Sequence, residues 1–434
     1  MRQSAAEVDV VVVGGGLSGL GAAAYLARAG MSVRLVERAS AVGGRAATAR
    51  VKGYSLNRGP HALYRTGEAF QVLRELGVPF AGRRPDVRGS ALRDGQLSAL
   101  PVDFLTLLRT RLLGWKAKQE LAGLLSGVAR LDTRKLDGVS LRDWLARVLS
   151  HPESRDVVEA FCRLGTYAHR PEVFSAGTAV RQLQKALAGV LYVDGGWQTL
   201  ADGLAGVAEA AGARIECGVR VEALLRAGAR DYEVALGEGR GLRASAVVLA
   251  TPPQEAARLL ESAGITPPTS VAGAVPVRLA TLDVALARLP RAGTRFALGI
   301  DRPLYFSAHS AAARLAPPGA ALVHVSKYLR GDEADPTSDR AELEALLDEM
   351  QPGWRSELVH AQYLPRIVVA ERLDVAAEGG ANGRPAAAVS ELPGVFLAGD
   401  WVQGGSWLAD ASLGSARAIG HALVTARGSC RAVA

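Results

Sequence analysis

A glycine-rich turn near the start of the chain has the residue types and spacing of a phosphate-binding loop. Gly14, Gly16 and Gly19 form the pattern GxGxxG, directly after the β-branched run 10–13. In such a turn the glycines let the backbone approach a diphosphate and let a helix pack closely on the preceding strand. Unpaired N–H groups at the helix start then favour the anion. The pattern predicts a nucleotide site, with a chance glycine-rich turn as the alternative.

The residues on either side of the turn predict the elements that must position it. The run 10–13 is typical of a buried parallel strand. Residues 17–29 have a helix pattern, which Gly30 ends at the expected C-terminal position. Leu17 and Ser18 open this helix, so we expect them to lie against the phosphates.

A carboxylate completes the unit. Residues 32–36 predict a second strand that ends at Glu37, 21 positions after Gly16. A carboxylate at this place can accept hydrogen bonds from ribose hydroxyls. We expect its neighbour Arg38 to contact the nucleotide as well. The βαβ unit by itself does not distinguish NAD from FAD.

A second glycine pair follows shortly after the carboxylate. Gly43 and Gly44 allow the backbone to lie close to a bulky ligand, and Arg45 can hold a diphosphate through its planar fork. The alternative is an ordinary turn before a predicted strand at 45–51. Residues 57–63 then predict a tight loop. Four of its residues are expected to contact the ligand: Gly59, Pro60, His61 and Ala62.

Together these motifs resemble the N-terminal part of the FAD-dependent amine oxidase and phytoene desaturase superfamily, which also includes protoporphyrinogen oxidases. The resemblance implies an α/β fold in which an FAD-binding, Rossmann-type three-layer domain carries an inserted α+β substrate domain. It assigns residues 1–65, 194–253 and 390–434 to a discontinuous FAD-binding domain. Residues 66–193 and 254–389 are assigned to the substrate domain.

Two later blocks extend the resemblance. In the first, Val221 matches the residue whose backbone faces the adenine. In the second, Gly399 and Asp400 end an apolar strand, and the resemblance implies that Asp400 accepts from a ribityl hydroxyl. Leu408 and Ala409 begin the segment whose helix N-terminus can face the pyrimidine edge of a flavin. No cysteine precedes this block at the spacing used for a thioether link, which implies that FAD is bound non-covalently.

The resemblance also suggests three catalytic candidates. In the amine oxidases a lysine on the first strand of the substrate sheet holds a water near flavin N5, and by approximate alignment this chain has Arg278 there. An ion pair at the surface or between domains is the alternative for Arg278. Trp407 aligns with one aromatic of the amine-oxidase cage, or it packs in the core. His61 is the other polar residue matched to a position near the ring.

The implied reaction is a two-electron oxidation in which hydride passes from a substrate C–H bond to flavin N5. Desaturation or dehydrogenation of a small, largely hydrophobic or biosynthetic substrate is the first hypothesis, with O2 or a quinone as electron acceptor. An amine oxidase that forms an imine is the second, although Arg278 and the lack of a clear second cage tyrosine count against it. A non-catalytic escort protein of the Rab GDP-dissociation-inhibitor type is the third.

Composition limits the alternatives further. With 49% hydrophobic and 22% charged residues, the chain is typical of a globular protein. Its net charge of +8 comes from scattered arginines without a long basic run, which argues against nucleic-acid binding. Three cysteines without metal spacing predict neither a metal site nor a disulfide framework. Because no signal peptide is recognisable, we expect a cytoplasmic protein.

The middle of the chain is matched only loosely by the resemblance. Residues 164–176 resemble the pocket-lining segment of the desaturase branch. Residues 100–131 carry apolar side chains at helical spacing, interleaved with cations. One interpretation is a helix pair that docks on a membrane, so that contact with lipid is at most peripheral. The favoured alternative is the wall of a substrate pocket with a solvated outer face. Short strands over 275–328 and a helix at 339–350 predict an antiparallel sheet beneath that pocket.

Overall fold

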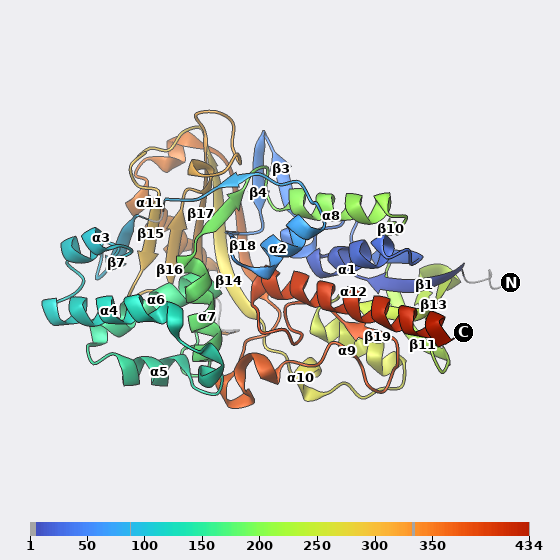
Figure 1. Ribbon diagram of the computed structural model, residues 1–434. Helices are drawn as coiled ribbons and strands as arrows, with labels where there is room; N and C mark the ends of the chain where they lie inside the picture. The colour runs from blue at the N-terminus through green and yellow to red at the C-terminus, as the bar shows by residue number, and fades with distance from the viewer. Residues whose placement is uncertain (1–5, 87, 332–334, 434) are drawn as a thin grey trace.

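Two seven-stranded sheets organise the computed structural model, which describes residues 6–86, 88–331 and 335–433 (Figure 1). The first sheet collects strands from three distant parts of the chain. Its strands follow the order β10-β2-β1-β13-β12-β11, and β19, outside this order, also pairs with β13. The strands are β1 (Ala6–Val13), β2 (Val33–Glu37), β10 (Arg214–Cys217), β11 (Val221–Gly228), β12 (Asp231–Leu236), β13 (Gly241–Leu249) and β19 (Val395–Leu397).

The first sheet is the middle of three layers, as predicted. Strand β1 pairs in parallel with β2 and β13, and apolar cores cover both of its faces. Val10 and Val12 pack into a core formed with α1, α8 and α12, whereas Val11 and Val13 point into the core beside α9. Figure 1 shows α12 lying along α1. The helices are α1 (Leu17–Arg28), α8 (Gln198–Ala210), α9 (Pro253–Ser262) and α12 (Leu408–Val433).

The second sheet has the order β18-β14-β17-β16-β15-β7-β8. One face packs on α11 (Pro336–Met350), and the other lies against a helical core that includes Leu121, Val157 and Trp407. Its strands are β7 (Ser90–Arg93), β8 (Gln96–Ala99), β14 (Val277–Leu286), β15 (Phe296–Gly299), β16 (Leu304–Ser307), β17 (Ala321–Tyr328) and β18 (Leu358–Ala370). The helices of that core are α3 (Phe104–Arg109), α4 (Trp115–Gly127), α5 (Leu141–Val148), α6 (Pro152–Thr166) and α7 (Ala176–Leu187).

The fold class is confirmed, but three local predictions were wrong. The sequence pattern of residues 213–225 predicts one strand, and these residues form two, because Gly218 takes a φ of +75° between them. Helical patterns dominate the sequence over residues 66–190, yet the hairpin β7–β8 in that region joins the second sheet, where β7 pairs in parallel with β15. The long strand β18 was missed, since its polar residues and its proline hide any alternation. The domain boundaries themselves stay a prediction, although the two sheets draw their strands from opposite sides of them.

No helix within the described ranges has the combined length and apolar composition needed to cross a bilayer. Among the same residues, no group of three or more His, Cys, Asp and Glu side chains is arranged to hold a metal ion.

A buried ion pair fixes the segment between β18 and β19. Arg384 donates to both carboxylate oxygens of Asp374, at 2.8 and 2.7 Å, and both side chains are fully buried. Thr178 on α7 donates to the same carboxylate at 2.8 Å. The pair therefore joins the segment that leads to the last strand of the first sheet to a helix beside the second.

We expect Asp374→Ala to lower the free energy of unfolding by about 3–5 kcal/mol, because it leaves a buried guanidinium without its counter-ion. Urea denaturation of the FAD-loaded protein measures the change. The matched control, Glu391→Ala, removes an exposed carboxylate and should change stability little. Equal stability of the two variants would show that Arg384 does not depend on this carboxylate.

Candidate active site

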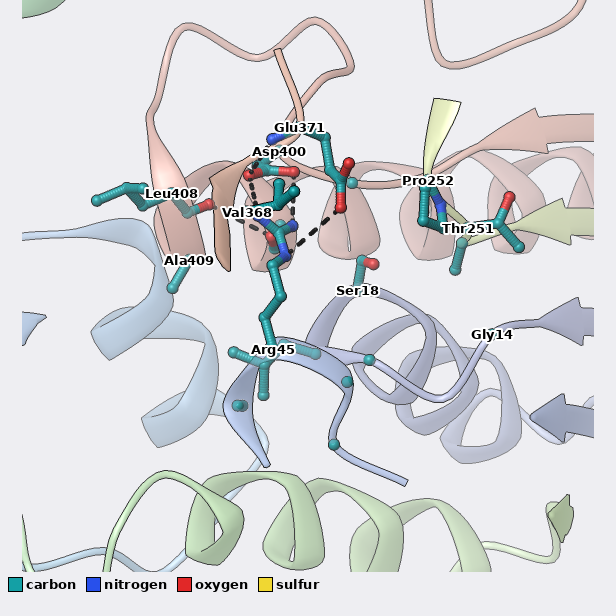
Figure 2. A pocket seen from close by; sticks show the side chains of 18 of the residues that line it. Gly14, Ser18, Arg45, Thr251, Pro252, Val368, Glu371, Asp400, Leu408 and Ala409 are labelled. Atoms are coloured by element: carbon teal, nitrogen blue, oxygen red, sulfur yellow. Dashed lines mark hydrogen bonds and ion pairs between the residues drawn. The ribbon is translucent and has the colours of Figure 1, made fainter. Parts of the chain in front are cut away.

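A cavity of about 530 Å³ lies between the two sheets (Figure 2). Its walls come from the turn after β1, the loop at residues 43–46, the loop before residue 63, the end of β18 and residues 398–412. All the residues predicted to bind the cofactor, except Gly19 and Gly59, line this cavity. The fold thus gathers segments almost 400 residues apart around one space.

The first glycine turn is shaped by close backbone approach. A Cβ atom on Gly14, which has a φ of +107°, would lie 2.4 Å from the carbonyl oxygen of Ala250. A Cβ atom on Gly19 would lie 1.9 Å from the oxygen of Gly14. Gly16 differs, because a Cβ atom there would meet no atom within 4 Å and would extend into the cavity. Gly19 therefore serves the packing of α1 on β1, and Gly16 keeps the cavity floor open.

The start of α1 provides an anion site at this floor. Gly16 is the N-cap, no side chain caps the helix, and its first turn carries no acidic residue. Leu17 and Ser18 both line the cavity. The first N–H groups of α1 and the positive end of its dipole are thus directed at the cavity, which fits a diphosphate. The residues at the start of α1 therefore fit the diphosphate of the FAD that the sequence predicts.

Glu37 organises the same turn through both carboxylate oxygens. One oxygen accepts from Gly15 N at 2.6 Å, and the other accepts from Ala39 N at 2.7 Å. Glu37 also lines the cavity, together with its neighbour Arg38 and with Val221 from the start of β11. Each carboxylate oxygen has a further lone pair, so the side chain can hold the loop and still accept from a ribose.

Arg45 crosses the cavity toward the other glycine motif (Figure 2). Its guanidinium donates to both oxygens of Asp400 at 2.7 Å and to Val369 O at 2.9 Å, and its Nε lies 3.8 Å from Glu371. Burial opposes the charge on Arg45, but Asp400 and Glu371 outweigh it and raise the pKa of the guanidinium. In this structure the fork holds Asp400, and its predicted contact with a diphosphate stays a prediction.

The loop at Gly59 presents His61 to the cavity. Gly59 has a φ of +81° and donates its N–H to the buried carboxylate of Asp283 at 3.2 Å. His61 Nδ1 lies 3.0 Å from Gly59 O, which can only accept, so Nδ1 carries the proton and Nε2 is left as an acceptor. Burial lowers the pKa of His61 to about 4, so the ring is neutral at pH 7. Its ring lies 4.8 Å from that of Trp197.

Tyr167 lines the cavity beside this loop. It ends α6 with a φ of 63°, a left-handed conformation that a bulky residue rarely adopts. Its hydroxyl donates to Pro60 O at 3.1 Å. The segment resemblance pointed to this region. Tyr167 is one of the residues of that segment, and it lines the cavity. Nothing in the sequence signalled Trp197 or Glu371 as wall residues.

Two catalytic candidates lie outside the cavity lining. Trp407 is buried, donates from Nε1 to Thr166 O at 3.0 Å and packs against Phe174, with 5.6 Å between ring centroids. Packing, the alternative weighed for Trp407, accounts for these contacts. Arg278 lies on β14 opposite Val368 of β18 and is not among the residues that line the cavity. Its position does not support contact with a substrate. Of the three candidates, His61 lines the cavity.

The two-sheet α/β fold, the glycine turn, the terminal carboxylate and the Gly-Asp motif at one cavity define an FAD-binding protein of the oxidoreductase type. The chain belongs to the family of flavin-containing amine oxidoreductases, which matches residues 17–418. Membership confirms the predicted superfamily and FAD as the cofactor, and it favours an oxidoreductase over an escort protein.

One relative named as an amine oxidase and one named as a desaturase are similar in sequence to this chain. A Mycobacterium tuberculosis protein with the provisional name flavin-containing monoamine oxidase AofH is 33% identical over 232 residues, or 50% of this chain and 51% of that protein. Hydroxyneurosporene desaturase of Rubrivivax gelatinosus is 30% identical over 275 residues, covering 55% and 52%. The matched regions thus span about half the length of these relatives.

Solved structures support the same architecture. A variant from the redesign of cofactor binding in putrescine oxidase superposes with a TM-score of 0.77. That comparison covers 98% of this chain and 100% of the other, at 19% identity. At this identity the likeness shows the fold alone.

We expect Glu37→Ala to weaken FAD binding by roughly ten- to a hundred-fold, because hydrogen bonds to a charged acceptor contribute about 1.5–3 kcal/mol. Fluorescence titration of the apoprotein with FAD measures the dissociation constant. Glu209→Ala, which removes an exposed carboxylate on α8, is the control. An unchanged dissociation constant for Glu37→Ala would place the carboxylate outside the nucleotide site.

We expect the free energy of unfolding to fall as the pH decreases from about 6.5 to about 4. Burial lowers the pKa of both His61 and His169 to about 4 from 6.5, so in this window the unfolded chain binds more protons than the folded one. His169→Gln should reduce the loss between pH 7 and pH 5 by about 1 kcal/mol, since the ring is partly exposed.

Urea denaturation at both pH values checks this expectation. His421→Gln, which replaces an exposed histidine on α12, is the matched control. A loss that is the same in wild type and His169→Gln would mean that His169 protonates equally in both states.

Proposed function

We propose that the protein catalyses the FAD-dependent, two-electron oxidation of a small, largely hydrophobic molecule by desaturation or dehydrogenation. The observation that carries this proposal is the cavity itself, which runs from the glycine turn to a wall of Leu63, Tyr64, Tyr167, Trp197 and Ile367. One end has the groups that hold a dinucleotide. The other end is apolar and aromatic, so it favours a hydrophobic substrate that loses its surrounding water on binding. The desaturase relative supports the same class of reaction.

The chain's own residues bind and orient the two partners. The start of α1 and Glu37 hold the nucleotide end, while Asp400 and the segment at Leu408 and Ala409 lie where the flavin end is expected. Bound FAD supplies a two-electron acceptor for hydride from a substrate C–H bond. Neutral His61 presents Nε2 as a hydrogen-bond acceptor and orients a donor in the cavity. The buried aromatic wall excludes water from the reacting carbon.

Oxidation of an amine to an imine is the second candidate. The AofH relative supports it, and the aromatic faces of Tyr167 and Trp197 attract an amine or its cation. Arg278 in place of the expected lysine counts against it. For either reaction we propose that O2 or a quinone reoxidises the cofactor and that the protein acts in the cytoplasm.

Anaerobic bleaching of the bound flavin tests the reaction class. Apolar alkenes and polyenes should bleach the flavin bands, whereas simple amines should leave them. Bleaching by amines alone would replace the proposal with the amine oxidase. Tyr167→Ala should slow bleaching by more than tenfold with FAD retained, and Tyr363→Ala, which changes a tyrosine of β18 away from the cavity lining, should not.

Acid precipitation tests the mode of attachment. We expect the yellow colour to pass into the supernatant, because no cysteine is placed to form a thioether with the flavin. Trichloroacetic acid treatment followed by absorbance of both fractions measures it, with free FAD mixed with an unrelated protein as the control. Colour that stays in the washed pellet would contradict non-covalent binding.

A further inference from the structure

Helices α3 and α4 expose large apolar side chains far from the first sheet, at the end of the molecule where α3 and α4 project (Figure 1). Phe104 is 71% exposed, Leu105 56% and Leu108 44%. Trp115, at the first position of α4, is 65% exposed. We call these four residues the α3–α4 patch. Scattered single apolar residues are ordinary on a protein surface, but a cluster of this kind marks an interaction site.

The patch is a second apolar face, distinct from the one that stabilises the fold. The same helices bury Leu107, Ala117 and Leu121 in the core of the second sheet. A capping box at Asp103 and Thr106 fixes the start of α3. Lys118 Nζ donates to Leu108 O at 2.8 Å, which holds the start of α4 against the end of α3. The packed core beneath the two helices therefore holds the exposed side chains in place. The outer face of residues 100–131, which the sequence predicts to be solvated, is only partly polar.

Cations border the patch. Arg109, Arg111 and Lys116 are exposed, and among the described residues none of them forms an ion pair. The nearby acids are engaged elsewhere: Asp103 pairs with Arg88 at 3.0 Å, and Glu120 accepts from the backbone of Ser150. Glu153 also lies near this region, with a carboxylate oxygen 3.8 Å from a Cβ built on Gly114. The surface around the apolar side chains is thus predominantly positive.

We propose that the α3–α4 patch docks the protein on a membrane surface that contains anionic lipid. Apolar and aromatic side chains that project from helix ends can enter the boundary between headgroups and acyl chains, while arginine and lysine beside them pair with lipid phosphates. The two short helices form a projection instead of a groove, which suits insertion into a lipid layer better than enclosure by a folded partner. This inference stands independently of the proposed reaction.

Vesicle co-sedimentation of the FAD-loaded protein tests the proposal. Wild type should sediment with vesicles of phosphatidylcholine and phosphatidylglycerol and much less with phosphatidylcholine alone. The double variant Phe104→Ser/Trp115→Ser should lose at least tenfold in partitioning to the anionic vesicles, since two inserting side chains are removed. Arg109→Gln/Lys116→Gln should weaken binding at low salt and flatten its salt dependence.

Matched controls lie at the far end of the molecule. Leu225→Ser removes an exposed leucine of β11, and Arg230→Gln removes an exposed cation of the β11–β12 turn. Both should bind vesicles as wild type does. Retained flavin absorbance and circular dichroism show that each variant is folded; if Phe104→Ser/Trp115→Ser fails this check, the milder Phe104→Gln is used for the same comparison.

Three outcomes would overturn the proposal. The first is wild type that stays in the supernatant with both vesicle types at low salt, and the second is a patch variant that sediments as wild type does. The third is a wild-type dimer in analytical ultracentrifugation that Phe104→Ser/Trp115→Ser converts to monomer, which would assign the patch to contact between copies of this chain.

Discussion

The contact between Arg45 and Asp400 is the interaction on which the site depends most. The two residues are 355 positions apart and meet through two parallel hydrogen bonds of 2.7 Å. The same guanidinium reaches Val369 O at the end of β18 and lies near Glu371. One planar cation therefore joins the second glycine loop, the last strand of the first sheet and an edge strand of the second. Lysine could not make these directed contacts at once, because it lacks the fork.

Charge balance around this contact explains why the cavity tolerates so many ionisable groups. Asp400 is fully buried and would be costly without a partner, whereas Arg45 keeps part of its side chain at the cavity surface. Burial raises the pKa of Glu371, and the Arg45 guanidinium opposes that rise. The polar groups at the Gly59 loop are stabilised in a different way. The Gly59 loop is anchored by the buried Asp283, which also accepts from His324 at 2.6 Å, whereas burial lowers the pKa of His61 and keeps its ring neutral.

Short-range patterns predicted the nucleotide half of the site well. Gly14, Gly16 and Glu37 act within one βαβ unit, where the spacing in sequence is nearly the spacing in space. The substrate half depends on contacts between distant segments. Trp407 was matched to a cage aromatic, with core packing as the alternative, and its contacts are those of a core residue. Trp197, far from it in sequence, lines the cavity, and its ring lies 4.8 Å from that of His61 at an angle of 55°. The residues next to each tryptophan do not distinguish one that packs in a core from one that lines a cavity. Only the tertiary packing does.

The sequence by itself determined the class of fold, the cofactor motif and the order of the chain segments that build it, because glycine conformations and the alternation of buried residues are local properties. The tertiary structure decided which side chains share the cavity. It paired Arg45 with Asp400, set Arg278 on β14 outside the cavity lining and turned Phe104 and Trp115 outward. Those outcomes depend on contacts between segments far apart in the chain. The residues of one short segment do not determine the free energy of such contacts.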